Sequence, residues 1–98
     1  ANPRHRIAAR SAGQLAAVGV VRAGAPPDTH QLSMAVDPAA RGRPEAAMTG
    51  ALLAELARYR PNDIEAEMAG VETAAIAALE AAGFTRRRTL DRLVLRLA

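Results

Sequence analysis

The hydrophobic period of the chain changes at Pro44, and this change limits the folds that the chain can adopt. Before it, a valine-rich run covers 14–22 and predicts a buried strand, and apolar residues that alternate over 29–36 predict a second strand. After it, apolar side chains recur every three or four residues from Pro44 to Tyr59, which predicts a helix. A chain with both periods is predicted to form a sheet with helices packed on it.

The remaining segments continue this alternation. We expect a strand at 64–68, a helix at 72–82 that ends at Gly83, and a closing hairpin formed by 84–88 and the alternating leucines at 93, 95 and 97. The fold class is therefore α/β (α+β), with two helices on a mixed, mostly antiparallel sheet. We expect one domain over 1–98, with 1–13 as an edge strand or an arm.

Composition excludes several classes of protein. The 98 residues include no cysteine, which excludes disulfide scaffolds and thiolate sites, and 23% are charged, which is typical of an ordinary folded domain. The net charge is +3 and all 13 basic residues are arginine, but aromatic residues make up only 2%, so bases have no stacking platform. We expect a cytoplasmic protein that binds neither nucleic acid nor membrane.

The junction between the strand at 29–36 and the helix after Pro44 is a candidate anion site. A loop that leads into a helix N-terminus presents free backbone N–H groups and the positive end of the helix dipole. Arg41 and Arg43 add guanidinium groups, which can bind phosphate through two hydrogen bonds. The alternative is an ordinary turn with solvated arginines.

This junction carries a resemblance to a known family. The stretch from 36 to 56 reads VDPAARGRPEAAMTGALLAEL and resembles the acyl-CoA pyrophosphate loop of the GNAT superfamily of N-acyltransferases. The stretch from 71 to 84 reads VETAAIAALEAAGF and is similar to the helix that precedes a Gly-Phe pair in that family. The resemblance begins near Gln14, and the order of elements agrees with it. It implies a GNAT-like fold that lacks the family's first strand and first two helices.

The resemblance also implies a function, which is acyl transfer from acetyl-CoA, the co-substrate, to a primary amine on a small molecule or a peptide. The strand end at Met34, Ala35 and Val36 is expected to bind the pantetheine arm. The pyrophosphate is expected to lie on a second set of residues, namely Arg41, Gly42, Arg43 and Ala46.

Four residues depart from the family's pattern. Pro44 stands where a glycine is usual and removes one N–H, while Glu45 places a carboxylate beside the expected pyrophosphate. Glu72 replaces an asparagine, and Leu79 stands in place of a tyrosine that is implied to protonate the leaving thiolate. These departures favour an alternative, a degenerate and non-catalytic GNAT-like domain that serves as a structural or pairing module.

Few other residues suggest chemistry. His30 is the candidate general base, because an imidazole can accept and donate a proton, although a lone histidine at a strand end is also typical of a surface. No His, Asp or Glu spacing predicts a metal site. The edge near 4–10 and the valine-rich strand suggest that the chain forms a homodimer or is covered by another segment of a longer protein.

Overall fold

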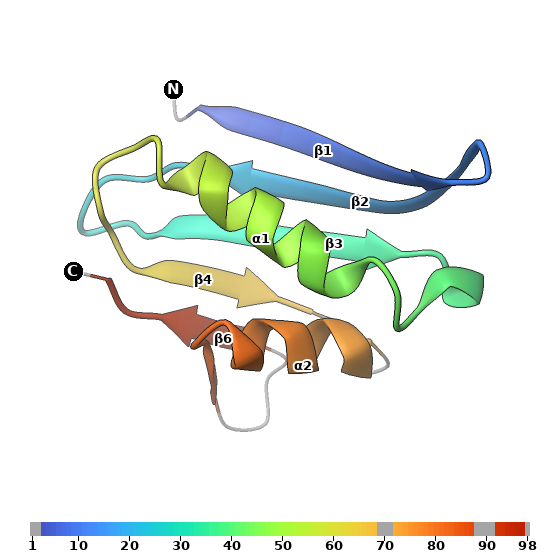
Figure 1. The fold of residues 1–98 in the computed structure, drawn as a ribbon. Helices are drawn as coiled ribbons and strands as arrows, with labels where there is room; N and C mark the ends of the chain where they lie inside the picture. Colours follow the sequence, from blue (N-terminus) through green and yellow to red (C-terminus); the bar gives the residue numbers. More distant parts are fainter. Residues whose placement is uncertain (1–2, 69–71, 88–91, 98) are drawn as a thin grey trace.

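The computed structural model describes residues 3–68, 72–87 and 92–97, and places them in one sheet with two α-helices and a short 3₁₀ helix (Figure 1). The elements in chain order are β1 (Arg4–Ser11), β2 (Gln14–Arg22), β3 (His30–Val36), η1 (Pro38–Ala40), α1 (Glu45–Leu56), β4 (Ile64–Glu67), α2 (Thr73–Ala81), β5 (Thr85–Arg87) and β6 (Arg92–Leu95).

The six strands form a single sheet in the order β1-β2-β3-β4-β6-β5. All neighbouring pairs are antiparallel except β3 and β4, which are parallel and joined by α1. This crossover is needed because parallel strands cannot be joined by a tight turn. The fold class expected from the sequence is confirmed.

Both α-helices cover the same face of the sheet, α1 over β1–β3 and α2 over β4 and β6 (Figure 1). Alternate strand residues face them and form the core, in which Leu52, Ile64 and Leu93 are fully buried. Gly19 lies directly beneath α1, because a Cβ at this position would stand 2.8 Å from both the Leu52 methyl groups and the Met48 sulfur. The absence of a side chain there lets α1 approach β2 closely.

The opposite face carries no helix among the described elements, and we call it the open face. Its side chains follow the strand register, so Arg4, Arg22, Gln31 and Glu65 form one row across four strands. The run at 14–22 is therefore not buried on both sides, since Val18 and Val20 are only half-buried on the open face. The expectation of a fully buried strand is wrong because only one layer of helices covers it.

The boundaries of the elements differ little from those expected. The N-terminal segment is a strand, β1, and it turns into β2 through Ala12 and Gly13, both with positive φ, as a tight hairpin requires. Glu72 directly precedes α2 without a side-chain capping hydrogen bond, and Gly83 follows the helix with φ of 104°. Leu97 is exposed and lies beyond β6, so the alternation of leucines overestimates that strand. Arg88, at the end of the expected hairpin segment, lies outside the described residues.

Within the described part of the chain, none of the helices has both the length and the apolar character needed to cross a membrane.

Candidate functional site

The loop between β3 and α1, residues 37–44, is built by short-range hydrogen bonds. Asp37 Oδ1 accepts from the Ala39 N–H at 3.2 Å and so caps η1. The Asp37 N–H donates to the Ala16 carbonyl at 2.8 Å, which ties the start of the loop to β2. The loop is therefore held against the sheet at the carboxyl end of β3.

The first turn of α1 carries a buried carboxylate that faces back into this loop. Glu45 is 4% exposed, and both of its carboxylate oxygens accept from the Gly42 N–H, at 3.0 and 2.9 Å. A carboxylate in the first helical turn also interacts favourably with the helix dipole. Gly42 has φ of 96°, a conformation that glycine adopts without strain. The Glu45 carboxylate thus accepts the hydrogen bond from the Gly42 N–H, a group that the sequence analysis assigns to a phosphate.

A second carboxylate comes from the start of α2. Glu72 Oε1 accepts from the Val36 N–H at 3.4 Å and lies 3.8 Å from the Arg41 guanidinium. The Glu72 side chain is 11% exposed and that of Arg41 is 36% exposed. One carboxylate therefore contacts both the last residue of β3 and the first cation of the loop.

Where these contacts lie, the edge of β3 that faces β4 has no registered strand partner among the described residues, which leaves an opening there. The registered pairs between β3 and β4 end at Leu32 and Ala66, whereas β2 continues to pair with β3 as far as Val36. The Val36 N–H points away from β2, because it meets Glu72. At the described end of β3, a side chain therefore takes the place of a neighbouring strand.

The other residues expected to bind the cofactor lie around this opening. Met34 and Val36 are buried toward the helices, while Ala35 is exposed on the open face. Ala46 is exposed on the first turn of α1. The Arg43 guanidinium turns back and donates to the Ala39 carbonyl at 3.0 Å. All seven expected residues therefore belong to one end of β3, the loop that follows it or the first turn of α1.

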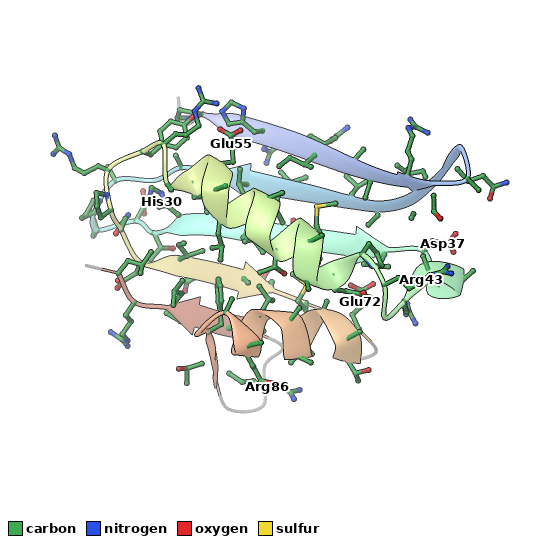
Figure 2. All side chains as sticks on the ribbon, viewed as in Figure 1. His30, Asp37, Arg43, Glu55, Glu72 and Arg86 are labelled. Carbon is green, nitrogen blue, oxygen red and sulfur yellow. The ribbon has the colours of Figure 1, made fainter. Side chains whose placement is uncertain are left out.

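His30 lies at the other end of β3 from Glu72 (Figure 2). It is 3% exposed, its Nδ1 accepts from the Gly24 N–H at 2.9 Å, and its Nε2 lies 3.0 Å from the Arg60 carbonyl. These partners require a neutral ring with the proton on Nε2. A ring that uses both nitrogens in this way has no free site for a substrate proton. The geometry gives no support to the expected catalytic role and favours a structural one.

Leu79 is fully buried in the core. A leucine side chain has no proton to donate, so Leu79 cannot take the role that the resemblance implies for a tyrosine at this position. Among the described residues, no three His, Cys, Asp or Glu side chains are grouped as metal ligands.

The contacts of Glu45 and Glu72 were not predicted from the sequence. Glu45 follows Gly42 by three residues, the spacing at which a glutamate reaches back to a backbone N–H at a helix start, so a local signal for its contact exists. Glu72 is 36 residues away from Val36. Its contact depends on the packing of α2 beside β3, for which the sequence offers no local signal.

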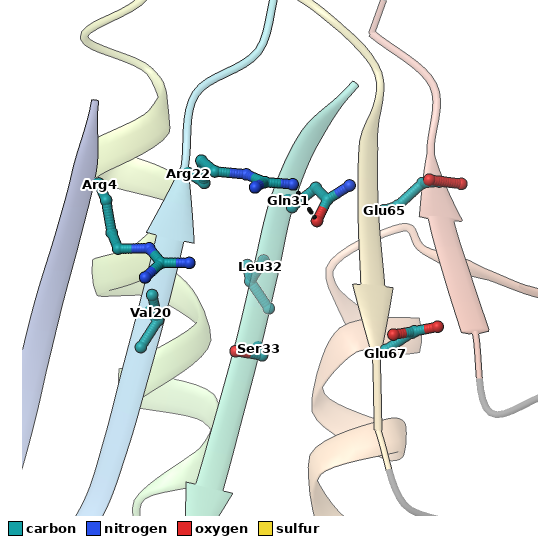
Figure 3. A pocket seen from close by; sticks show the side chains of 8 residues that line it. All are labelled: Arg4, Val20, Arg22, Gln31, Leu32, Ser33, Glu65 and Glu67. Carbon is teal, nitrogen blue, oxygen red and sulfur yellow. Dashed lines mark hydrogen bonds between the residues drawn. The ribbon is translucent and has the colours of Figure 1, made fainter. Parts of the chain in front are cut away.

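A hollow of about 280 Å³ lies on the open face (Figure 3). The side chains of Arg4 and Arg22 reach toward β3 from one side, and Ser33 lies between them and the glutamates at 65 and 67 on β4. Arg22 donates to Gln31 Oε1 at 2.9 Å. Cationic and anionic side chains are thus separated across the width of one strand.

Comparison with solved structures identifies this arrangement. The crystal structure of the GNAT domain of S. lividans PAT superposes with a TM-score of 0.67 and 26% sequence identity, over 96% of this chain. The chain has the GNAT fold. The resemblance seen in the loop and the second helix is thereby confirmed for the fold.

The match covers a smaller share of the other chain than of this one. The chain spans 61% of the length of that GNAT domain. No family model and no curated protein matches the sequence. The GNAT fold places the loop at 37–44 and the edge of β3 in an acetyltransferase-type architecture.

Proposed function

We propose that this chain is an acyl-CoA-dependent N-acyltransferase domain that transfers an acetyl group from acetyl-CoA to a primary amine. The observation that carries the proposal is the Val36 N–H, which lies beyond the last registered pair of β3 and β4 and meets a carboxylate oxygen at 3.4 Å. An exposed strand edge can pair with an extended ligand that has amide and carbonyl groups, and pantetheine is such a ligand.

The loop supplies partners for the other end of the cofactor. The Gly42 N–H and the Arg41 guanidinium lie at the start of α1, where the helix dipole favours an anion. A pyrophosphate fits these groups, which already bind carboxylates, because phosphate and carboxylate oxygens accept the same hydrogen bonds. Pro44 contributes no N–H, so this loop offers one donor fewer than a loop with glycine there.

The amine approaches from the open face, because α1 and α2 cover the opposite face. In the proposed reaction the amine nitrogen attacks the thioester carbonyl carbon. The N–C bond forms, the C–S bond breaks, and the sulfur leaves as a thiolate. Water accepts the proton of the amine, since neither His30 nor Leu79 can take part. Proximity and orientation then supply most of the rate increase.

Calorimetry with acetyl-CoA, and a thiol-release assay with a panel of small amines and amine-bearing peptides, test the proposal. We expect acetyl-CoA to bind more tightly than pantetheine alone, because only acetyl-CoA reaches the loop. Absence of both acetyl-CoA binding and thiol release overturns it.

A second function, a non-catalytic pairing module, is favoured by the buried Leu79 and by the position of β1. This strand is at the edge of the sheet, and β2 is its registered partner. An edge strand can pair with a second copy of the chain, although Arg4, Arg6 and Arg10 limit such pairing by their charge. Light scattering distinguishes the two functions: a dimer without acetyl-CoA binding supports the module, and a monomer at high concentration contradicts it.

A further inference from the structure

We propose that the carboxylates of Glu45 and Glu72 occupy the positions of two cofactor groups, and that these two residues set the affinity for the cofactor by competing with it. The inference rests on the proposed function, because it concerns the same opening and the same loop. It concerns two residues that the resemblance presents only as departures from the family's pattern.

Glu45 matches a phosphate in charge and in contacts. It is a buried anion at a helix N-terminus, and its two oxygens accept from one backbone N–H at 3.0 and 2.9 Å. A phosphate group at that N–H must displace the Glu45 carboxylate, since a donor with one hydrogen cannot serve both fully. Two anions at one helix N-terminus also repel each other.

Glu72 matches a carbonyl of an extended ligand at the edge of β3. Its Oε1 accepts from the Val36 N–H and lies 3.8 Å from Arg41, so one oxygen bridges the strand edge and the cation of the loop. A ligand that takes either partner weakens the hold of Glu72 on the other. Arg41 is exposed enough to turn toward a pyrophosphate once Glu72 releases it.

The two contacts differ in how easily they are broken. The Glu45 contact is local, made across three residues, and two short distances hold it. The Glu72 contacts are at 3.4 and 3.8 Å and link elements that are far apart in the sequence. Glu72 is therefore released more readily, and Glu45 is the stronger competitor.

Isosteric variants test the inference without removing the hydrogen-bond acceptors. Glu45→Gln and Glu72→Gln keep a side-chain oxygen and lose the negative charge. We expect Glu45→Gln to bind acetyl-CoA about tenfold more tightly than the wild type, because a hydrogen bond to a charged group contributes on the order of a tenfold factor. Glu72 is the weaker competitor, so Glu72→Gln should gain less, about threefold. Glu80→Gln, on the exposed side of α2, makes the same change in net charge away from the site and is expected to leave the affinity unchanged.

A second probe separates this inference from the proposed function. Inorganic pyrophosphate carries the anion without the pantetheine arm, and Glu45→Gln should bind it about tenfold more tightly than the wild type. Equal acetyl-CoA affinity in the wild type and both variants overturns the inference and leaves the function intact. Tighter pyrophosphate binding without acetyl-CoA binding in any variant overturns the function, and with it the inference that the two glutamates compete with this cofactor. Binding of neither probe to any variant overturns both.

Discussion

The two ends of β3 are both held by polar side chains, but the two sets of contacts have different chemistry. At the start of the strand, His30 and Asn62 join three segments through neutral hydrogen bonds. The amide of Asn62, 5% exposed, donates to the Gly24 and Asp28 carbonyls at 3.0 and 2.8 Å, and its oxygen accepts from the Asp63 N–H at 2.9 Å.

At the other end of the strand, carboxylates take the place of the neutral partners. Glu45 and Glu72 accept from the N–H groups of Gly42 and Val36. Neutral donors and acceptors that match one another give a closed network, which stabilises the fold. A charged group on a backbone donor can be replaced by a ligand of the same charge. This difference supports a structural role for the first end and the ligand binding that we propose for the second.

The largest expected effect is on stability, at the neutral end. Asn62→Ala removes the partner of two carbonyls and one N–H in part-buried hydrogen bonds, so we expect the free energy of unfolding to fall by about 3 kcal/mol. This corresponds to a decrease in Tm of roughly 12–24 °C for a domain of this size. Chemical denaturation followed by circular dichroism measures the change.

Gln31→Ala is the matched control, because this exposed amide has a hydrogen bond to Arg22 on the open face. Its cost should stay below about 0.5 kcal/mol. Equal losses in the two variants would show that the network around Asn62 is not what holds this end of the strand.

The next effect is on binding, at the charged end. Arg41→Ala should weaken acetyl-CoA binding by about 1.5–3 kcal/mol, or roughly 10- to 150-fold, because a charged donor to the pyrophosphate is lost. Calorimetry measures this change. Arg58→Ala removes the same charge from an exposed ion pair with Glu55 on α1 and should leave the affinity unchanged. If Arg41→Ala binds as tightly as the wild type, Arg41 does not belong to the site.

The two ends also differ in how far the sequence predicts them. The loop at the charged end follows from local order, since a strand, two arginines and a helix start lie within 36–45. The contact of Glu72 could not be predicted, because α2 must first pack beside β3. At the neutral end, the partners of His30 are backbone groups of Gly24 and Arg60, which no residue type reveals.

The fold was more predictable than either site. The alternation of period 2 over 29–36 places β3 to within one residue, and the period of 3.6 after Pro44 places α1 to within three. One-sided burial of β2 was missed, since the apolar run from Leu15 to Val21 does not alternate with polar residues, which is typical of a strand buried on both faces. The sequence does not show that the described helices cover one face alone.

A smaller effect concerns Pro44, which lies next to the charged end. Pro44→Gly restores one N–H to the loop, so we expect acetyl-CoA affinity to rise about fivefold, equivalent to one hydrogen bond of about 1 kcal/mol. The glycine also makes the unfolded chain more flexible, and the free energy of unfolding should fall by about 0.5–1 kcal/mol. Calorimetry and denaturation measure the two changes.

Ala47→Gly, on an exposed position in α1, gives the same loss of stability without a new donor in the loop. We expect this control to leave the acetyl-CoA affinity unchanged. Unaltered or lower affinity in Pro44→Gly would place the pyrophosphate away from this loop.

The smallest expected effect is on the stability of the charged end, in Glu72→Gln. Glu72→Gln should change the free energy of unfolding by less than about 0.5 kcal/mol, because the amide oxygen still accepts from the Val36 N–H. The charge interaction with a partly exposed Arg41 at 3.8 Å contributes little. When both variants are denatured, the loss in free energy of unfolding should therefore be several times larger for Asn62→Ala than for Glu72→Gln. A loss of more than about 2 kcal/mol would make Glu72 a structural residue like Asn62. The carboxylate at the end of β3 would then be part of the architecture, and a cofactor could not displace it without unfolding this edge of the sheet.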